Sequence, residues 1–266
     1  MDILPETTSV SVEKIWNDDG NRDGKRSGSI TVALLKNGNQ VDTATITPDD
    51  NGDWKHTFID LEKYEDQGKL INYTVKEVKI PEYNSSVKKV ENKFTITNTH
   101  DISKTEIEAT KAWDDNDDQD GKRPDSVTLI LLADGKRIDS QVVNEDNGWT
   151  AKFTNLPVYN NGKTITYTVD EENIAPELGY TKHINGTIVT NSRTPETTSV
   201  TVNKEWHDEG NQDGKRPDSI TVRLLADGTK VKDATITPDN SGNWTYTWSG
   251  LAKYKAGQLI NYTVLE

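Results

Sequence analysis

The chain has 266 residues, of which 32% are hydrophobic and 28% are charged, and its formal net charge is −13. This length suffices for two or three small domains rather than one large core. The acidic charge argues against nucleic acid or an anionic membrane as a partner, and the absence of cysteine excludes disulfides and thiolate metal sites. No apolar run approaches the roughly 18 residues of a membrane span, and no signal peptide opens the chain.

The first residues have the composition of a linker. Met1 directly precedes this segment, so we expect a piece of a longer protein. Leu4-Pro5-Glu6-Thr7 also matches the start of a sortase sorting signal, but no glycine follows, and no apolar tail or basic end is present. A similar sequence, 194–198, precedes a later predicted strand. We therefore interpret the N-terminal segment as a linker.

The first predicted strand carries a lysine on its apolar face. Val10, Val12, Lys14 and Trp16 alternate with more polar neighbours, and a period of two places them on one face. A lysine in the middle of a buried face is unfavourable. The same pattern occurs twice more, at Ile107, Ala109, Lys111 and Trp113 and at Val200, Val202, Lys204 and Trp206. Three inward lysines in equivalent positions need a common explanation.

Further motifs follow each lysine in the same order, which indicates three copies of one unit. Each copy has an Asp-Gly-Lys-Arg segment, an alternating strand, a hairpin turn, a strand that holds a tryptophan, and a Tyr-Thr-Val strand. The Asp-Gly-Lys-Arg segments are 23–26, 120–123 and 213–216; the turns are Asn37-Gly38, Asp134-Gly135 and Asp227-Gly228; the tryptophans are Trp54, Trp149 and Trp244. Only the first two copies continue into a closing strand, 94–98 and 187–191.

Threonine and valine abound and long helical patterns are missing, so the predicted class is all-β. Each unit gives roughly seven short strands, the number of a small sandwich. We predict three tandem β-sandwich domains, 1–100, 101–194 and 195–266, the third without its last strand. Linkers are expected near Thr99–Glu106 and Ser192–Thr198, and three sandwiches on short linkers are expected to form a rod.

The strand period places two further polar residues in the core of each complete unit. Glu77 shares a face with Tyr73 and Val75, and Asn98 shares a face with Phe94 and Ile96. The equivalent residues of the second unit are Glu171 and Asn191. Each complete unit therefore buries one lysine, one glutamate and one asparagine.

Burial disfavours the charged forms of lysine and glutamate. A neutral lysine amine is a nucleophile, and an asparagine carboxamide is an electrophile. A neutral glutamic acid can polarise the amide and move protons as the amine attacks and ammonia leaves. These residues predict a Lys–Asn isopeptide bond, although an ordinary buried salt bridge beside a hydrogen-bonded amide is an alternative.

The Lys-x-Trp opening, the Asp-Gly-Lys-Arg segment, the Tyr-Thr-Val-x-Glu strand and the closing Thr-Asn resemble the B-type repeats of Gram-positive collagen adhesins, the Cna B-type domains. The resemblance covers nearly the whole chain. It implies a reverse-immunoglobulin, prealbumin-like sandwich with an autocatalytic intramolecular isopeptide bond. The implied bonds are Lys14–Asn98 with Glu77 as catalyst and Lys111–Asn191 with Glu171 as catalyst, while Lys204 and Glu266 of the third domain have no asparagine and Lys204 is expected to stay unbonded. Glu172 adjoins Glu171, but the alternation of the strand places it on the opposite face, away from the core.

The resemblance also implies a stalk that holds a ligand-binding region away from a bacterial cell wall, in a secreted, wall-anchored surface protein. We expect no turnover catalysis, because the three groups react once, and no cofactor. The expected partners are adjacent domains of a longer surface protein and, through another region, host extracellular matrix; we expect a monomer. One alternative is that the repeats themselves bind host matrix or another protein. The other is a pilin shaft subunit, for which no pilin-motif lysine or sorting signal is evident.

Three other features have simpler interpretations. Asp19–Gly24 and Asn116–Gly121 fit the start of a calcium loop, and 209–214 fits less well, but Ile30 and Val127 occupy the position of the closing glutamate. We expect acidic loops neutralised by the adjacent Lys-Arg pair. The four histidines (His56, His100, His183 and His207) lack metal or triad spacing and are expected at the surface. Trp16, Trp113, Trp206 and Trp248 are expected to pack in the core rather than form a carbohydrate platform.

Overall fold

The structure, a computed structural model, describes residues 4–266. Met1, which contributed to the expectation of an excised piece, lies outside the described residues. The chain divides into two compact units. One comprises Met1–Glu106 with Thr154–Thr166, and the other comprises Ile107–Phe153 with Tyr167–Glu266.

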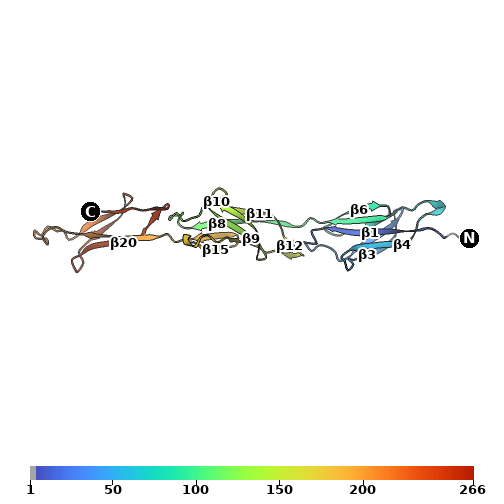
Figure 1. Cartoon of the computed structure of the whole chain (residues 1–266), viewed down its shortest axis with the longest axis horizontal. Coiled ribbons are helices and arrows are strands. Elements are labelled where there is room, and N and C mark those ends of the chain that lie inside the picture. Colours follow the sequence, from blue (N-terminus) through green and yellow to red (C-terminus); the bar gives the residue numbers. More distant parts are fainter. Residues whose placement is uncertain (1–3) are drawn as a thin grey trace. The chain divides into compact units, whose positions relative to one another are not determined.

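The first unit contains a seven-stranded β-sandwich, drawn in blue to green in Figure 1. One sheet has the strand order β4-β1-β7-β6 and the other has the order β3-β2-β5. The strands are β1 (Thr7–Asn17), β2 (Ile30–Lys36), β3 (Asn39–Ile46), β4 (Trp54–Glu62), β5 (Tyr73–Glu77), β6 (Asn84–Val90) and β7 (Lys93–Thr99), with a 3-10 turn η1 (Asp66–Gly68) before β5. The unit also includes the hairpin β12 (Tyr159–Asn160) and β13 (Lys163–Thr164).

The core of this sandwich follows the predicted alternation. Val10, Val12 and Lys14 on β1 are all buried, whereas the residues between them are exposed or half-buried. The hairpin between β2 and β3 turns at Asn37 and Gly38, which both have positive φ (48° and 87°). Two successive positive φ values match the right-handed twist of the strands. The predicted turn is therefore confirmed.

The second unit contains two further sandwiches. In the second repeat the sheets are β11-β8-β16-β15 and β10-β9-β14. Its strands are β8 (Lys104–Asp114), β9 (Ser126–Ala133), β10 (Lys136–Asn144), β11 (Thr150–Pro157), β14 (Tyr167–Glu171), β15 (Thr181–Asn185) and β16 (Ile188–Ser192), with a 3-10 turn η2 (Pro176–Leu178) after β14.

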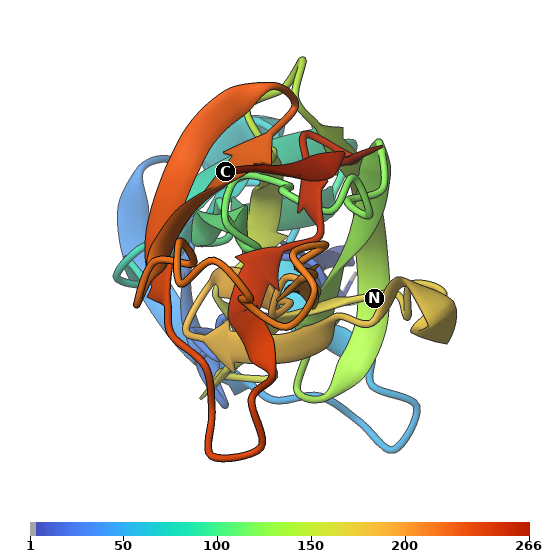
Figure 2. The ribbon, with the colours of Figure 1, turned by 90° about the vertical axis from the view of Figure 1, so that its left-hand side faces the viewer.

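The third repeat, shown in orange and red in Figure 2, has five strands in its two main sheets, against seven in each of the other repeats. Its sheets are β17-β20 and β19-β18-β23, with a small hairpin β21-β22. The strands are β17 (Thr197–Lys204), β18 (Ile220–Ala226), β19 (Thr229–Ile236), β20 (Trp244–Ala252), β21 (Tyr254–Lys255), β22 (Gln258–Leu259) and β23 (Tyr262–Leu265). Within the described chain, this repeat has no strands equivalent to β6 and β7 or to β15 and β16. The all-β prediction with an incomplete third sandwich is confirmed.

No helix in the part of the chain that the structure describes is long and apolar enough to span a membrane.

Two details of the predicted strands are wrong. The first strand of each repeat starts earlier than predicted, at Thr7, Lys104 and Thr197, so the linkers are shorter. Thr7 and Thr197 extend the ladders because they pair with the far ends of β4 and β20. Trp149 lies just before β11 rather than in it, with a φ of 57°. The tight turn 145–148 places it in this left-handed conformation, which the equivalent Trp54 does not need.

Candidate functional site

The three predicted residues of the first repeat come from both sheets and meet in its core. Lys14 lies on β1, Asn98 on β7 and Glu77 at the end of β5. The Lys14 Nζ atom is 2.8 Å from Glu77 Oε1, and the two side chains are 0% and 3% exposed. Asn98 is completely buried. The structure therefore places all three side chains in the interior of the first repeat.

Strand register explains why Asn98 joins Lys14. The strands β1 and β7 are parallel, with Lys14 opposite Ile96 and Trp16 opposite Asn98. Residues two apart on a strand face the same side, so Asn98 faces the core on the strand next to Lys14. Glu77 reaches the same interior from the opposite sheet, where it pairs with Val32 on β2.

The second repeat repeats this arrangement. Lys111 Nζ is 3.4 Å from Glu171 Oε2, and the side chains are 0% and 2% exposed. Asn191 Nδ2 donates a 2.8 Å hydrogen bond to Glu171 Oε1. The lysine also donates to the carbonyl oxygens of Ala112 and Val189, at 3.0 and 3.3 Å. Glu172, next in sequence, is exposed and pairs with Arg137, as its parity predicted.

Burial changes the acid–base behaviour of both lysines. It lowers the pKa of Lys14, because desolvation outweighs the hydrogen bond and the charge of Glu77. It lowers the pKa of Lys111 to about 8, against the charge of Glu171. The amines also lie over tryptophan rings, 4.5 Å from the Trp16 centroid and 4.1 Å from the Trp113 centroid. These rings partly stabilise the cation, but the net effect is a lowered pKa for both lysines, which makes the free amine easier to reach.

The amide of Asn98 is poorly satisfied. Among residues 4–266, neither its Nδ2 nor its Oδ1 atom has a hydrogen-bond partner, and Asn191 Oδ1 lacks one as well. An unpaired buried polar group costs about 1–3 kcal/mol. Both asparagines therefore occupy unfavourable environments unless the amide changes its bonding.

Ser85 on β6 is a site residue that sequence reasoning missed. Its hydroxyl donates a 3.1 Å hydrogen bond to Glu77 Oε2, and it lies opposite Asn98 in the β6–β7 ladder. The equivalent partner of Asn191 is Lys182, which contacts the Asp170 carboxylate and the Glu171 carbonyl instead. All seven residues of β6 are exposed, so no apolar alternation marks this strand in the sequence.

The third repeat keeps two of the three groups. Lys204 Nζ is 2.7 Å from Glu266 Oε2, but these side chains are 24% and 49% exposed. The ammonium lies 4.5 Å from the Trp206 ring, as in the other repeats. The strand β17 pairs only with β20, so no asparagine-bearing strand lies beside Lys204 in the described chain.

The acidic loops after the first strands are neutralised by arginine. Asp18 is buried and accepts hydrogen bonds from Arg26 (Nη2 at 2.5 Å and Nε at 3.0 Å) and from the Tyr83 hydroxyl at 2.8 Å. Asp115, Arg123 and Tyr180 form the same arrangement in the second repeat. Among residues 4–266, no group of three or more His, Asp or Glu side chains is placed to hold a metal ion. The calcium interpretation gains no support from these contacts.

Predictions for the histidines and tryptophans were partly right. Trp248 is buried at 4% exposure, and Trp16 packs edge-on against Trp54 and Tyr83. His183 and His207 are exposed. His100 was predicted at the surface, and this is wrong: its side chain is 12% exposed and both ring nitrogens have partners. Its partners are distant in sequence, so the sequence could not reveal them.

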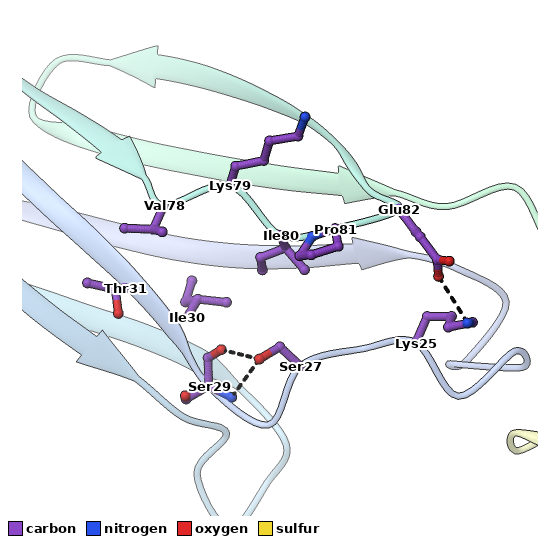
Figure 3. A pocket seen from close by; sticks show the side chains of 10 residues that line it. All are labelled: Lys25, Ser27, Ser29, Ile30, Thr31, Val78, Lys79, Ile80, Pro81 and Glu82. Atoms are coloured by element: carbon purple, nitrogen blue, oxygen red, sulfur yellow. Dashed lines mark hydrogen bonds and ion pairs between the residues drawn. The ribbon is translucent and has the colours of Figure 1, made fainter.

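The surface pocket in Figure 3 is separate from the three buried groups. It has a volume of about 510 Å³ and is lined by residues of the segments 25–31 and 78–82. None of Lys14, Glu77 and Asn98 lines it. The three buried side chains therefore do not open onto this pocket.

The fold and the site define a class of protein: tandem β-sandwich repeats that enclose a lysine, a glutamate and, where the last strand is present, an asparagine. The family model of the Cna protein B-type domain matches residues 10–99, 107–192 and 200–266. The chain belongs to this family, and the resemblance noted from the sequence is confirmed.

Two relatives extend this finding. Over 267 residues the chain is 45% identical to a collagen adhesin of Staphylococcus aureus, and the match covers 98% of this chain and 22% of the relative. The crystal structure of two B repeat units of the collagen-binding protein of Staphylococcus aureus aligns with a TM-score of 0.65 and 40% identity, covering 97% of this chain and 68% of that one. The chain thus spans about a fifth of the length of the collagen adhesin that it matches.

Proposed function

We propose that Lys14 bonds to Asn98, and Lys111 to Asn191, through self-catalysed isopeptide bonds that make these repeats a rigid stalk. The observation that carries the proposal is the convergence of an amine, a carboxyl group and a carboxamide in a dry core, twice in one chain. Proximity of this kind replaces a bimolecular encounter and supplies much of the rate.

In the proposed reaction the uncharged Nζ of Lys14 attacks Cγ of Asn98. A new C–Nζ bond forms, and the bond from Cγ to Nδ2 breaks. Glu77 takes a proton from Nζ and returns one to Nδ2, so that ammonia leaves and the carboxyl group ends as it began. No oxidant, metal or cofactor is required. The groups are consumed in one reaction, which is why we propose no turnover enzyme.

An ordinary buried ion pair is the competing interpretation, and two observations in the first repeat favour the isopeptide bond. The Asn98 amide lacks hydrogen-bond partners within residues 4–266, and the Lys14 amine is buried beside a single carboxylate. Replacing an amine and a primary amide by one secondary amide removes a buried ionisable group. The second repeat places the asparagine amide 2.8 Å from the proton-transferring carboxylate.

The position of the bond suits a mechanical role. It would join the first strand of a repeat to the last, β1 to β7 or β8 to β16, and these strands are parallel neighbours. Force on the two ends of a repeat would then pass through a covalent bond rather than through strand hydrogen bonds. Similarity to a collagen adhesin supports a place in the stalk of a wall-anchored surface adhesin.

Intact mass tests the proposal directly. The folded protein is expected to be lighter than its sequence mass by two ammonia molecules, and Glu77→Gln or Glu171→Gln should each restore one. Peptide mapping should find Lys14 linked to Asn98 and Lys111 linked to Asn191.

The matched control is Glu172→Gln, because Glu172 adjoins Glu171 but is exposed. It should leave the mass deficit unchanged, as should Lys204→Ala. A wild-type protein with its full sequence mass would refute the proposal.

A further inference from the structure

The segment that leaves the first sandwich is tied back to the acidic loop after β1. Asp23 is 5% exposed, and its Oδ2 atom accepts the backbone N–H of Ser103 at 2.8 Å. The same oxygen lies 2.9 Å from Nε2 of His100. The other ring nitrogen, Nδ1, lies 2.9 Å from the carbonyl oxygen of Glu82. One carboxylate thus anchors both a side chain and the backbone of the linker.

The two neighbours of the His100 ring are both acceptors. A neutral imidazole has one N–H group and one lone pair, whereas the imidazolium has two N–H groups. Only the protonated ring can donate to Asp23 and Glu82 at the same time. Deprotonation leaves one ring lone pair facing an oxygen at 2.9 Å, so one of the two contacts must weaken.

The other charged groups around His100 are already paired. The Glu82 carboxylate is 3.2 Å from the Lys25 ammonium, and Figure 3 shows these two side chains pointing toward each other. The Tyr83 ring packs 5.3 Å from the imidazole, and its hydroxyl donates to Asp18, which Arg26 also neutralises. Asp23 is therefore the carboxylate that directly faces the ring. Its hydrogen bond raises the pKa of His100.

The second repeat supplies an internal comparison. Arg193 follows Asn191 by the same spacing that separates His100 from Asn98. Its guanidinium pairs with Asp120, whose Oδ2 also accepts the backbone N–H of Glu196 at 2.9 Å. Arg193 Nε donates to the carbonyl of Leu178 at 2.9 Å. The anchoring is the same, but the cation is an arginine, which remains charged throughout the physiological range.

We propose that His100 is a pH-sensitive latch that ties the first linker to Asp23, whereas Arg193 ties the second linker to Asp120 at every physiological pH. The pKa of His100 in the folded chain is raised from its ordinary value of 6.5. The latch is therefore complete at a pH below the pKa of the unfolded chain, and it is lost as the pH rises through the pKa of the folded chain. The pKa of Asp23 is lowered: burial alone would raise it, but the contacts of His100 and Ser103 outweigh that effect. Its carboxylate therefore stays charged across this window. The latch is independent of the proposed isopeptide bonds.

Nuclear magnetic resonance of the whole chain tests the latch. The measurements are the titration of the His100 ring and the exchange protection factors of the Ser103 and Glu196 amides, each corrected for the intrinsic exchange rate at that pH. Between about pH 5 and pH 8, the range in which histidine switches, Ser103 protection should fall severalfold while Glu196 protection stays constant.

Two exchanged variants give the matched control. His100→Arg should make Ser103 protection independent of pH, and Arg193→His should give the Glu196 amide the pH dependence that Ser103 had. The latch is refuted if His100 titrates at or below its ordinary pKa, or if Ser103 and Glu196 respond alike in the wild type. Folding of each variant is checked by its unchanged strand amide spectrum.

Discussion

The closed sites of the first two repeats and the open site of the third differ by two strands, because within the described chain the third repeat has no counterparts of β6 and β7 or of β15 and β16. All three place a lysine ammonium over a tryptophan ring and beside a glutamate. The lysine side chains are 0% exposed in the first two repeats and 24% exposed in the third. The last two strands of a complete repeat therefore supply more than the asparagine, because the lysine amine is shielded from water only where they are present. The asparagine and the burial of the amine come with the same pair of strands.

The largest expected effect is on stability. Glu77→Gln should leave the first repeat without its bond and lower its free energy of unfolding by about 4–5 kcal/mol, by analogy with a disulfide that closes a loop of this length. Glu171→Gln should do the same to the second repeat. Calorimetry of each variant should show one transition move down while the transition of the third repeat stays in place. Unchanged transitions in both variants would contradict the contrast between closed and open sites.

A smaller effect concerns pH and the buried amine. In an Asn191→Ala variant, which cannot form the bond, Lys111 should keep the pKa of about 8 that burial gives it in the folded chain, against an ordinary value of 10.5 when unfolded. The unfolded state then binds more protons between these values, so stability should rise with pH in this window, by at most about 1.4 kcal/mol per pH unit. Urea unfolding at several pH values measures the slope.

Adding Lys111→Met to that variant provides the control, because it removes the titrating amine and fills a similar volume. The slope should disappear. A slope of the same size in both proteins would mean that another group causes it.

The Ser85 contact distinguishes the two closed sites from each other. Ser85→Ala removes the hydroxyl that donates to Glu77, and we expect a loss of about 1 kcal/mol in the stability of the first repeat. Lys182→Ala at the equivalent position should leave the Glu171 side chain undisturbed, because Lys182 does not contact that carboxylate oxygen. If both substitutions lowered the free energy of unfolding of their repeats by the same amount, the Ser85 hydroxyl would have no specific role at Glu77.

The smallest expected effect is repair of the open site. The unpaired edge of β17 can accept an added strand, so a peptide with the sequence of 186–191 should bind there and couple slowly, in low yield, to Lys204. Mass spectrometry would detect the adduct. The same peptide with alanine in place of its asparagine should bind without coupling, and Lys204→Arg should abolish coupling. If neither peptide bound, strand addition at the edge of β17 would be refuted.

Much of the fold and of the site could be predicted from the amino-acid sequence. Strand alternation placed Lys14, Glu77 and Asn98 on buried faces, because a period of two and a threefold repeat leave little choice of register. The Asn37-Gly38 turn was predictable, because only certain residues accept two positive φ values. The incomplete third sandwich followed from counting strands against the first two copies.

Tertiary structure alone decided the rest. The strand β6 has no buried residue, so no apolar pattern in its sequence could predict the Ser85 contact. His100 looked like an isolated surface residue, yet it meets Asp23 across 77 residues of chain. Such contacts join positions with no shared periodicity, and only the packing of β7 beside β1 brings them together. Local pattern fixes which face a side chain takes, whereas the neighbour it meets depends on how the strands are ordered in the sheet.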